Sequence, residues 1–173
     1  MPADTPLPPA SPSDSLTARS IRFAVTVLAP IALNLALGPQ PWLVYALLTA
    51  IASYSVDNGG SARMRLAWMG GVGFAIVLGA GLGSLAAESR ALTIAVFALG
   101  GVVYALSESG HQATLTLARF FCFGLAVGAL YRQIAPLDVA VVIGFVLFAW
   151  AISAGWDLVT GKWRPAELPA TAG

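Results

Sequence analysis

Charged side chains are scarce in this chain, making up only 10% of its 173 residues, whereas about 25% is usual in soluble domains. The apolar fraction is 58%, which is more apolar surface than a soluble fold of this length could bury. The net charge of +1 gives no indication of nucleic-acid binding. The composition therefore excludes an ordinary soluble domain and predicts an all-α integral membrane protein.

Cysteine and histidine occur once each, as Cys122 and His111. One cysteine excludes an internal disulfide, and neither residue belongs to a group with metal-ligand spacing. The sequence also lacks the GxSxG and HExxH motifs and any phosphate-binding loop. We therefore expect no metal, no cofactor and no enzymatic activity.

Six apolar runs of roughly membrane-spanning length follow one another along the chain, separated by short polar or proline-containing breaks. They are Ile21–Leu37, Trp42–Val56, Leu66–Leu85, Ala91–Leu106, Ala113–Tyr131 and Val139–Val159. The sequence thus predicts a six-helix transmembrane domain over residues 19–164. The proline-rich segment 1–18 is expected to be a disordered tail, and residues 165–173 a short cytoplasmic tail.

Basic residues separate into two groups if the six runs alternate in direction. With the amino terminus inside, the outer segments hold only two arginines, Arg90 and Arg132, and the inner segments hold Arg19, Arg22, Arg63, Arg65, Arg119, Lys162 and Arg164. The positive-inside rule then predicts cytoplasmic termini in a bacterial inner membrane. In this interpretation Arg63 and Arg65 set the topology and contact lipid phosphates.

The second and fourth runs end alike, which predicts a parallel internal repeat. VDNGG and SESGH each place an acid, Asp57 or Glu108, before a helix that carries a GxxxG step. Both runs reach only about 24 Å, against about 30 Å for the hydrocarbon core, and paired short segments indicate a transporter site. Asp57 and Glu108 are therefore candidates for proton coupling or gating. Alternatively, both acids cap their turns and face water.

Arg119 and His111 are the candidates for substrate binding. Arg119 lies about two turns, or about 10 Å, into the fifth run, where a buried arginine needs a partner or a wet cavity. Glu108, Asp57 or a substrate carboxylate could be that partner; otherwise the side chain extends to the lipid headgroups. His111 titrates near physiological pH and lies in the turn beside Glu108, although an exposed turn histidine would look the same.

Two GxxxG steps predict where helices pack closely. Gly79 and Gly83 form one step in the third run, and Gly124 and Gly128 form the other in the fifth. Small residues at this spacing let two helix backbones approach within a bilayer. The hydroxyl side chains of the second run could bridge helices or line a path; they are Thr49, Ser53, Tyr54 and Ser55.

A family resemblance is carried by the segment YALLTA at 45–50, the Gly59-Gly60 turn, Arg63 and Arg65, and the glycine-rich helix after them. This pattern resembles the amino-terminal membrane half of the fusaric acid resistance or aromatic acid exporter family, although Tyr45 stands where tryptophan is usual. Members of that family are often built from two six-helix halves, each with a cytoplasmic domain.

The resemblance implies a proton-driven exporter of small aromatic or weakly acidic compounds. Because only one six-helix half is predicted here, it also implies a homodimer embedded in membrane lipids. The alternative is a non-transporting scaffold or accessory subunit that binds another membrane protein through its glycine-rich helix faces.

Overall fold

The computed structural model describes residues 16–57, 61–110, 112–131 and 133–160 of the chain. Every regular element in these ranges is a helix, which confirms the predicted all-α class. The elements are α1 (Leu16–Leu37), α2 (Leu43–Ser55), α3 (Ala62–Ala86), α4 (Arg90–Glu108), α5 (Gln112–Ala126), the π-helical segment η1 (Val127–Tyr131) and α6 (Pro136–Val159).

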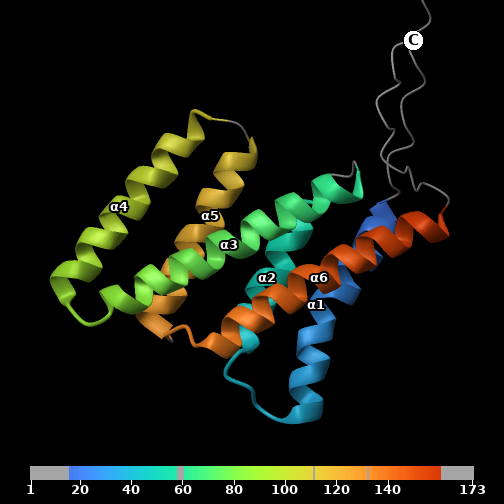
Figure 1. Cartoon of the computed structure of the whole chain (residues 1–173), viewed down its shortest axis with the longest axis horizontal. Coiled ribbons are helices and arrows are strands. Elements are labelled where there is room, and N and C mark those ends of the chain that lie inside the picture. Colours follow the sequence, from blue (N-terminus) through green and yellow to red (C-terminus); the bar gives the residue numbers. More distant parts are fainter. Residues whose placement is uncertain (1–15, 58–60, 111, 132, 161–173) are drawn as a thin grey trace, which may run out of the picture.

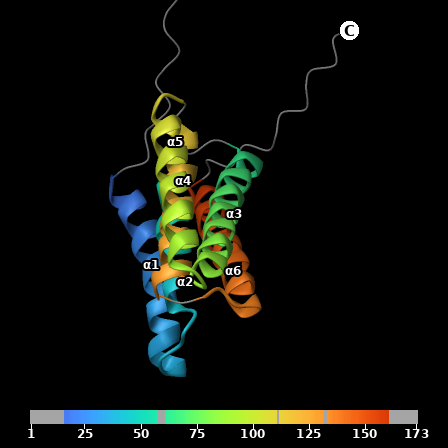
Figure 2. The ribbon, with the colours of Figure 1, turned by 90° about the vertical axis from the view of Figure 1, so that its left-hand side faces the viewer.

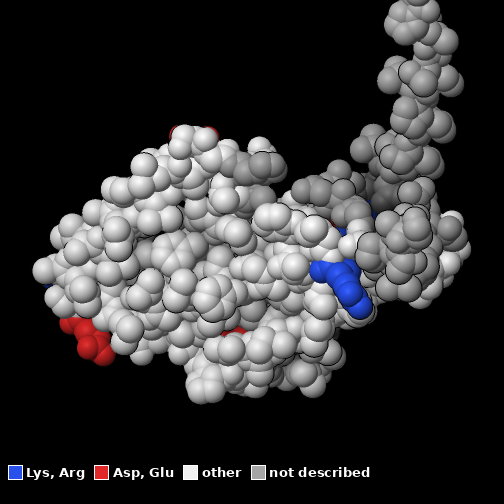
Figure 3. Space-filling model, turned by 45° about the horizontal axis from the view of Figure 1, so that its top comes forward, with Lys and Arg blue, Asp and Glu red and all other residues white. Residues whose placement is uncertain are grey.

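Five helical segments are long and apolar enough to cross a membrane: α1, α3, α4, α5 with η1, and α6. Charged side chains are sparse on the face shown in Figure 3. The shorter α2 has 13 residues, or about 20 Å. It packs against α1, α3 and α6, and six of its side chains are buried. Because protein covers so much of α2, its length need not match the thickness of the bilayer.

The fourth helix is longer than the sequence predicted. α4 has 19 residues and continues through Ser107 to Glu108, which gives about 28 Å. The expectation that the second and fourth runs are both short is therefore wrong for the fourth. The Ser107 hydroxyl donates to the Tyr104 carbonyl within the helix (2.6 Å), a local bond that lets a polar residue remain helical in an apolar segment. The internal repeat and the cytoplasmic position of the termini stay predictions.

α3 is the central helix of the bundle (Figure 1). It packs against α5 and η1 on one side and against α2 and α6 on the other, while α4 lies against α5 and α1 lies against α2 and α6. The helix axes look roughly aligned in the view of Figure 2, whereas Figure 1 shows that α3 and α6 cross α1 and α2 at an angle. The core between them is apolar and includes Tyr45, Met69, Val72, Ile76, Phe120, Val142 and Val146.

The contact between α3 and α5 is a close approach of two backbones at the four glycines of the GxxxG steps. A β-carbon at Gly79, Gly83, Gly124 or Gly128 would overlap a backbone carbonyl oxygen of the facing helix. Backbone atoms cannot move aside as a side chain can. The carbonyl oxygens concerned belong to Phe121 and Leu125 on α5, and to Ile76 and Ala80 on α3.

Polar groups tie the carboxyl-terminal end of α3 to its neighbours. The Thr93 hydroxyl donates to the Ala86 carbonyl (2.8 Å), which closes the α3–α4 connection. The Ser84 hydroxyl accepts from the Ile134 backbone N–H (2.9 Å). Asp138 in the first turn of α6 is fully buried, and its carboxylate accepts from the Ala135 backbone N–H (2.7 Å). These hydrogen bonds connect the end of α3 to α4 and to the segment that leads into α6.

We expect Gly79→Ala to lower the stability of the protein by about 1–3 kcal/mol, because the added methyl group meets backbone in a filled contact. Gly81→Ala is the matched control, since a β-carbon there meets open space. Thermal unfolding in detergent micelles, followed by circular dichroism, measures both. Equal melting temperatures for the two variants would contradict the close α3–α5 contact.

Candidate functional site

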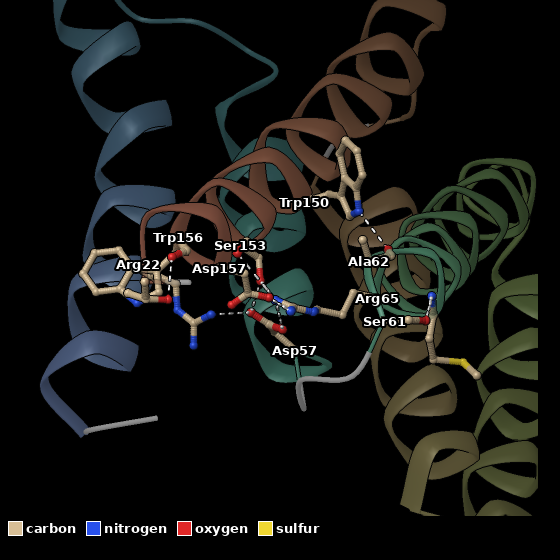
Figure 4. Close-up of polar contacts among 11 residues, drawn as sticks. Arg22, Asp57, Ser61, Ala62, Arg65, Trp150, Ser153, Trp156 and Asp157 are labelled. Carbon is tan, nitrogen blue, oxygen red and sulfur yellow. Dashed lines mark hydrogen bonds and ion pairs between the residues drawn. The ribbon is translucent and has the colours of Figure 1, made fainter. Parts of the chain in front are cut away.

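Four charged side chains meet inside one end of the bundle (Figure 4). They come from the start of α1, the end of α2, the start of α3 and the end of α6, and each is at most 10% exposed. Together with a serine of α6 they form what we call the charge cluster, which consists of Arg22, Asp57, Arg65, Ser153 and Asp157.

Arg65 lies at the centre of the charge cluster and contacts two helices. The guanidinium nitrogen Nη2 pairs with the Asp157 carboxylate. The other terminal nitrogen, Nη1, donates to the Ser153 hydroxyl. Nη1 also lies 3.8 Å from Asp57 Oδ1. The Ser153 hydroxyl in turn donates to Asp57 Oδ2 (2.7 Å). The fork of the guanidinium therefore links α3 to α6 and to the end of α2.

Arg22 brings α1 to the same carboxylate. Its Nη1 lies 3.7 Å from Asp57 Oδ2, and the Thr26 hydroxyl donates to the Arg22 carbonyl (2.8 Å). Beside this pair the rings of Phe23 and Tyr54 are 4.5 Å apart between centroids, a distance typical of favourable aromatic contacts. Asp57 is thus shared by arginines from two different helices.

The start of α3 is fixed by local sequence, and this places Arg65. Ser61 has an extended backbone and caps the helix by accepting from the Met64 N–H (3.3 Å), as serine commonly does at this position. The indole N–H of Trp150 on α6 donates to the Ala62 carbonyl (2.9 Å). With its first turn held at both points, α3 presents Arg65 toward the interior.

The charge cluster is neutral as a whole, because two arginines face two aspartates. Neutrality matters here, since an uncompensated charge inside a membrane bundle is costly. Two buried oxygens nevertheless have no hydrogen-bond partner in the described ranges, Asp57 Oδ1 and Ser53 Oγ. Ser53 lies one helical turn before Asp57. Both oxygens can accept a hydrogen bond from a water molecule or a ligand.

A small cavity adjoins the cluster. Its volume is about 10 Å³, roughly the room that one water molecule needs. The lining residues include Arg22, Thr26, Tyr54, Asp57 and Ser153. Charged, hydroxyl and aromatic groups thus face one small, partly open space. The cavity is too small to hold an organic molecule in this conformation.

The structure brings only one of the predicted site residues into the cluster. Asp57 is 8% exposed at its side chain and does not simply cap a turn in water. Glu108 and Arg119 are both exposed, and neither belongs to an ion pair of the described residues. They do not meet Asp57 or one another. His111 lies outside the described residues.

Sequence reasoning missed the roles of Arg65, Ser153 and Asp157, although a signal was present. At 3.6 residues per turn, Arg65 falls on the same face of α3 as Gly83, whereas Arg119 falls about 140° away from Gly124 on α5. The glycines mark the packed faces, so Arg65 points inward and Arg119 outward.

Asp157 could have been found in a similar way. It closes a stripe along α6 spaced by three or four residues, all of whose members are buried: Asp138, Val142, Val146, Ala149, Ser153 and Asp157. A stripe with this spacing is the packed face of a helix. Polar residues on that face, at the two ends of an apolar helix, therefore indicate buried polar contacts.

Fold and site together define a class: a helical protein with several segments long and apolar enough to cross a membrane and a buried, neutral cluster of charges at one end. No family model matches the chain, and no curated protein or solved structure shows significant similarity to it.

We expect Arg65→Gln to destabilise the protein by about 3–5 kcal/mol, because it leaves the buried Asp157 carboxylate without its cation. Arg63→Gln is the control, since Arg63 lies two residues away on the same helix and is exposed. Thermal unfolding in micelles should show a clear loss for the first variant and little change for the second. A similar small effect of both would mean that Arg65 does not hold the helices together.

Proposed function

We propose that this chain is a proton-linked transporter of small, weakly acidic organic compounds, including aromatic acids, in the bacterial inner membrane. The observation that carries the proposal is the charge cluster beside a cavity, at one end of a largely apolar bundle. Charged side chains inside membrane segments are rare and typically mark a substrate or proton pathway. A bundle that only needed to pack could do so with apolar residues, often without loss of stability.

The residues around the cavity suit a weak aromatic acid. The Arg22 guanidinium can bind a carboxylate through two parallel hydrogen bonds. Tyr54 lines the cavity together with Arg22, and its ring, packed against that of Phe23, offers an apolar surface for an aromatic group. Asp57 is the group that can take up or release a proton. The resemblance of the segment 45–83 to aromatic acid exporters favours the same substrate class.

The alternative function, a scaffold that binds through its glycine-rich faces, has less support. Its binding surfaces would be the two GxxxG steps, yet Gly79 and Gly83 already pack against the backbone of α5. Gly124 and Gly128 pack against the backbone of α3 in the same way. Neither step is open to another protein unless the bundle comes apart.

Uptake of radiolabelled 4-hydroxybenzoate into proteoliposomes under an imposed pH gradient tests the transport proposal. We expect uptake well above that of protein-free liposomes, and at least a tenfold loss in Arg22→Gln because the carboxylate then lacks its cation. Arg119→Gln is the matched control and should transport like the wild type, since Arg119 is exposed on α5. Circular dichroism of the purified variants checks that each is folded.

Two results would contradict the transport proposal. Wild-type uptake no faster than in protein-free liposomes would favour the accessory role. Uptake that depends on Arg119 but not on Arg22 would place the pathway on the other side of α3.

We also propose that two copies of the chain pair in the membrane, as the two six-helix halves of the resembled family imply. Most of α4 is available for such a contact, because Gly100 is the one buried residue of that helix. Chemical cross-linking in native membranes should give a dimer. A chain that transports but never cross-links would contradict pairing and leave the transport proposal standing.

A further inference from the structure

The charge balance of the cluster limits what can bind beside Asp57. Two arginines and two aspartates sum to zero when both carboxyl groups are ionised. Arginine keeps its charge at any pH that a folded protein meets, so only the carboxyl groups can change the sum. A proton on one of them leaves a single positive charge inside an apolar bundle, where such a charge is costly unless an anion joins it.

Asp57 is the carboxyl group best placed to take that proton. Its Oδ1 lies 3.8 Å from Arg65 Nη1 but accepts no hydrogen bond from the described residues, whereas the Asp157 carboxylate is in direct hydrogen-bonding contact with Arg65 Nη2. Asp57 also lines the cavity, and Asp157 is not among the lining residues. The groups that face Asp57 are Arg22 from α1, Arg65 from α3, Ser153 from α6 and Tyr54 from its own helix, with Asp157 lying beyond Arg65.

We infer that the site binds one carboxylate anion together with one proton, and that the chain therefore carries weak acids electroneutrally as a proton–anion symporter. The inference rests on the proposed function and adds how the two ions are coupled. The proton passes from water to Asp57, and no covalent bond of the substrate changes. The substrate carboxylate then takes over from Asp57 as the counter-ion of Arg22.

Proton and anion favour each other at this site, because each offsets the charge that the other brings. This coupling is reciprocal by linkage. An antiporter needs the opposite arrangement, in which the anion binds best while Asp57 is ionised. That state would set a third negative charge against two arginines. In symport the acid leaves the cell with its proton whenever the acid gradient exceeds the opposing proton gradient.

Opening the cavity requires a movement, and α1 is the helix that can make it. Only 17% of its membrane-crossing window is buried, compared with 50% for α3. Pro30 lies inside α1 and has no N–H to bond to the carbonyl of Thr26, a residue of the cavity wall. A tilt of α1 at Pro30 would separate Arg22 from α6 while α3 remains in place.

The coupling can be measured on binding alone, in weakly buffered detergent solution near neutral pH. Addition of 4-hydroxybenzoate to the wild type should raise the pH of the solution, with about one proton taken up for each anion bound. Asp57→Asn, which imitates the protonated carboxyl group, should bind the anion with no proton uptake. Glu108→Gln removes an exposed acid and should behave like the wild type.

Transport gives a second readout, because the net charge moved per transport cycle differs between the wild type and Asp57→Asn. Wild-type proteoliposomes should show 4-hydroxybenzoate uptake that is insensitive to membrane voltage. Asp57→Asn should carry the anion alone, so its uptake should respond to voltage and lose its dependence on the pH gradient.

Anion binding by the wild type without proton uptake would overturn the inference, as would wild-type transport that generates a current. Uptake driven by an acidic liposome lumen would also overturn the inference, because a pH gradient in that direction drives an antiporter and opposes a symporter. Each of these results leaves proton-linked or anion transport itself intact. Absence of both binding and uptake would instead contradict the proposed function.

Discussion

The bundle depends on one buried cation, Arg65, that must keep at least one counter-ion. Arg65 is buried where water cannot solvate it, so its position is set by the carboxylates of Asp57 and Asp157 and by the Ser153 hydroxyl. These partners come from the ends of two helices that are far apart in sequence. Satisfying one guanidinium therefore fixes the start of α3 relative to the ends of α2 and α6.

The two ends of α3 are held by different kinds of interaction, one suited to a fixed packing contact and the other to binding. Toward its middle and carboxyl-terminal end, α3 contacts α5 backbone to backbone at glycines, a contact that tolerates almost no movement. At its amino-terminal end the contacts are ion pairs and hydrogen bonds to α6 and to the end of α2. Ion pairs can exchange partners with a proton or an anion, whereas close backbone packing cannot. The half made of α3, α4 and α5 is thus suited to be the fixed frame, and α1 to be the part that moves.

Composition and the pattern of apolar runs were sufficient to predict the helical class and the apolar segments. The GxxxG steps were sufficient to predict where two helices pack closely. What they could not supply was orientation around each helix axis. Arg119 looked buried from its depth along α5, yet it is exposed, because depth does not say which side of the helix a residue occupies. Arg65 looked like an interfacial charge from its place in the first turn of α3, yet it is buried. Comparing each arginine with the glycine face of its own helix would have separated the two.

The pairing of partners was beyond the sequence for a different reason. Asp157 and Arg65 are 92 positions apart, and no local pattern specifies which acid meets which base. Their meeting follows from the α3–α6 packing, which in turn depends on how well whole helix faces fit. The partners of Asp57 were beyond the sequence for the same reason, so its prediction as a site residue rested on less than the structure shows. The sequence offered only a short run that ends in an acid. In the folded chain that acid is enclosed between two arginines, where gain or loss of a single proton changes the charge of the entire site.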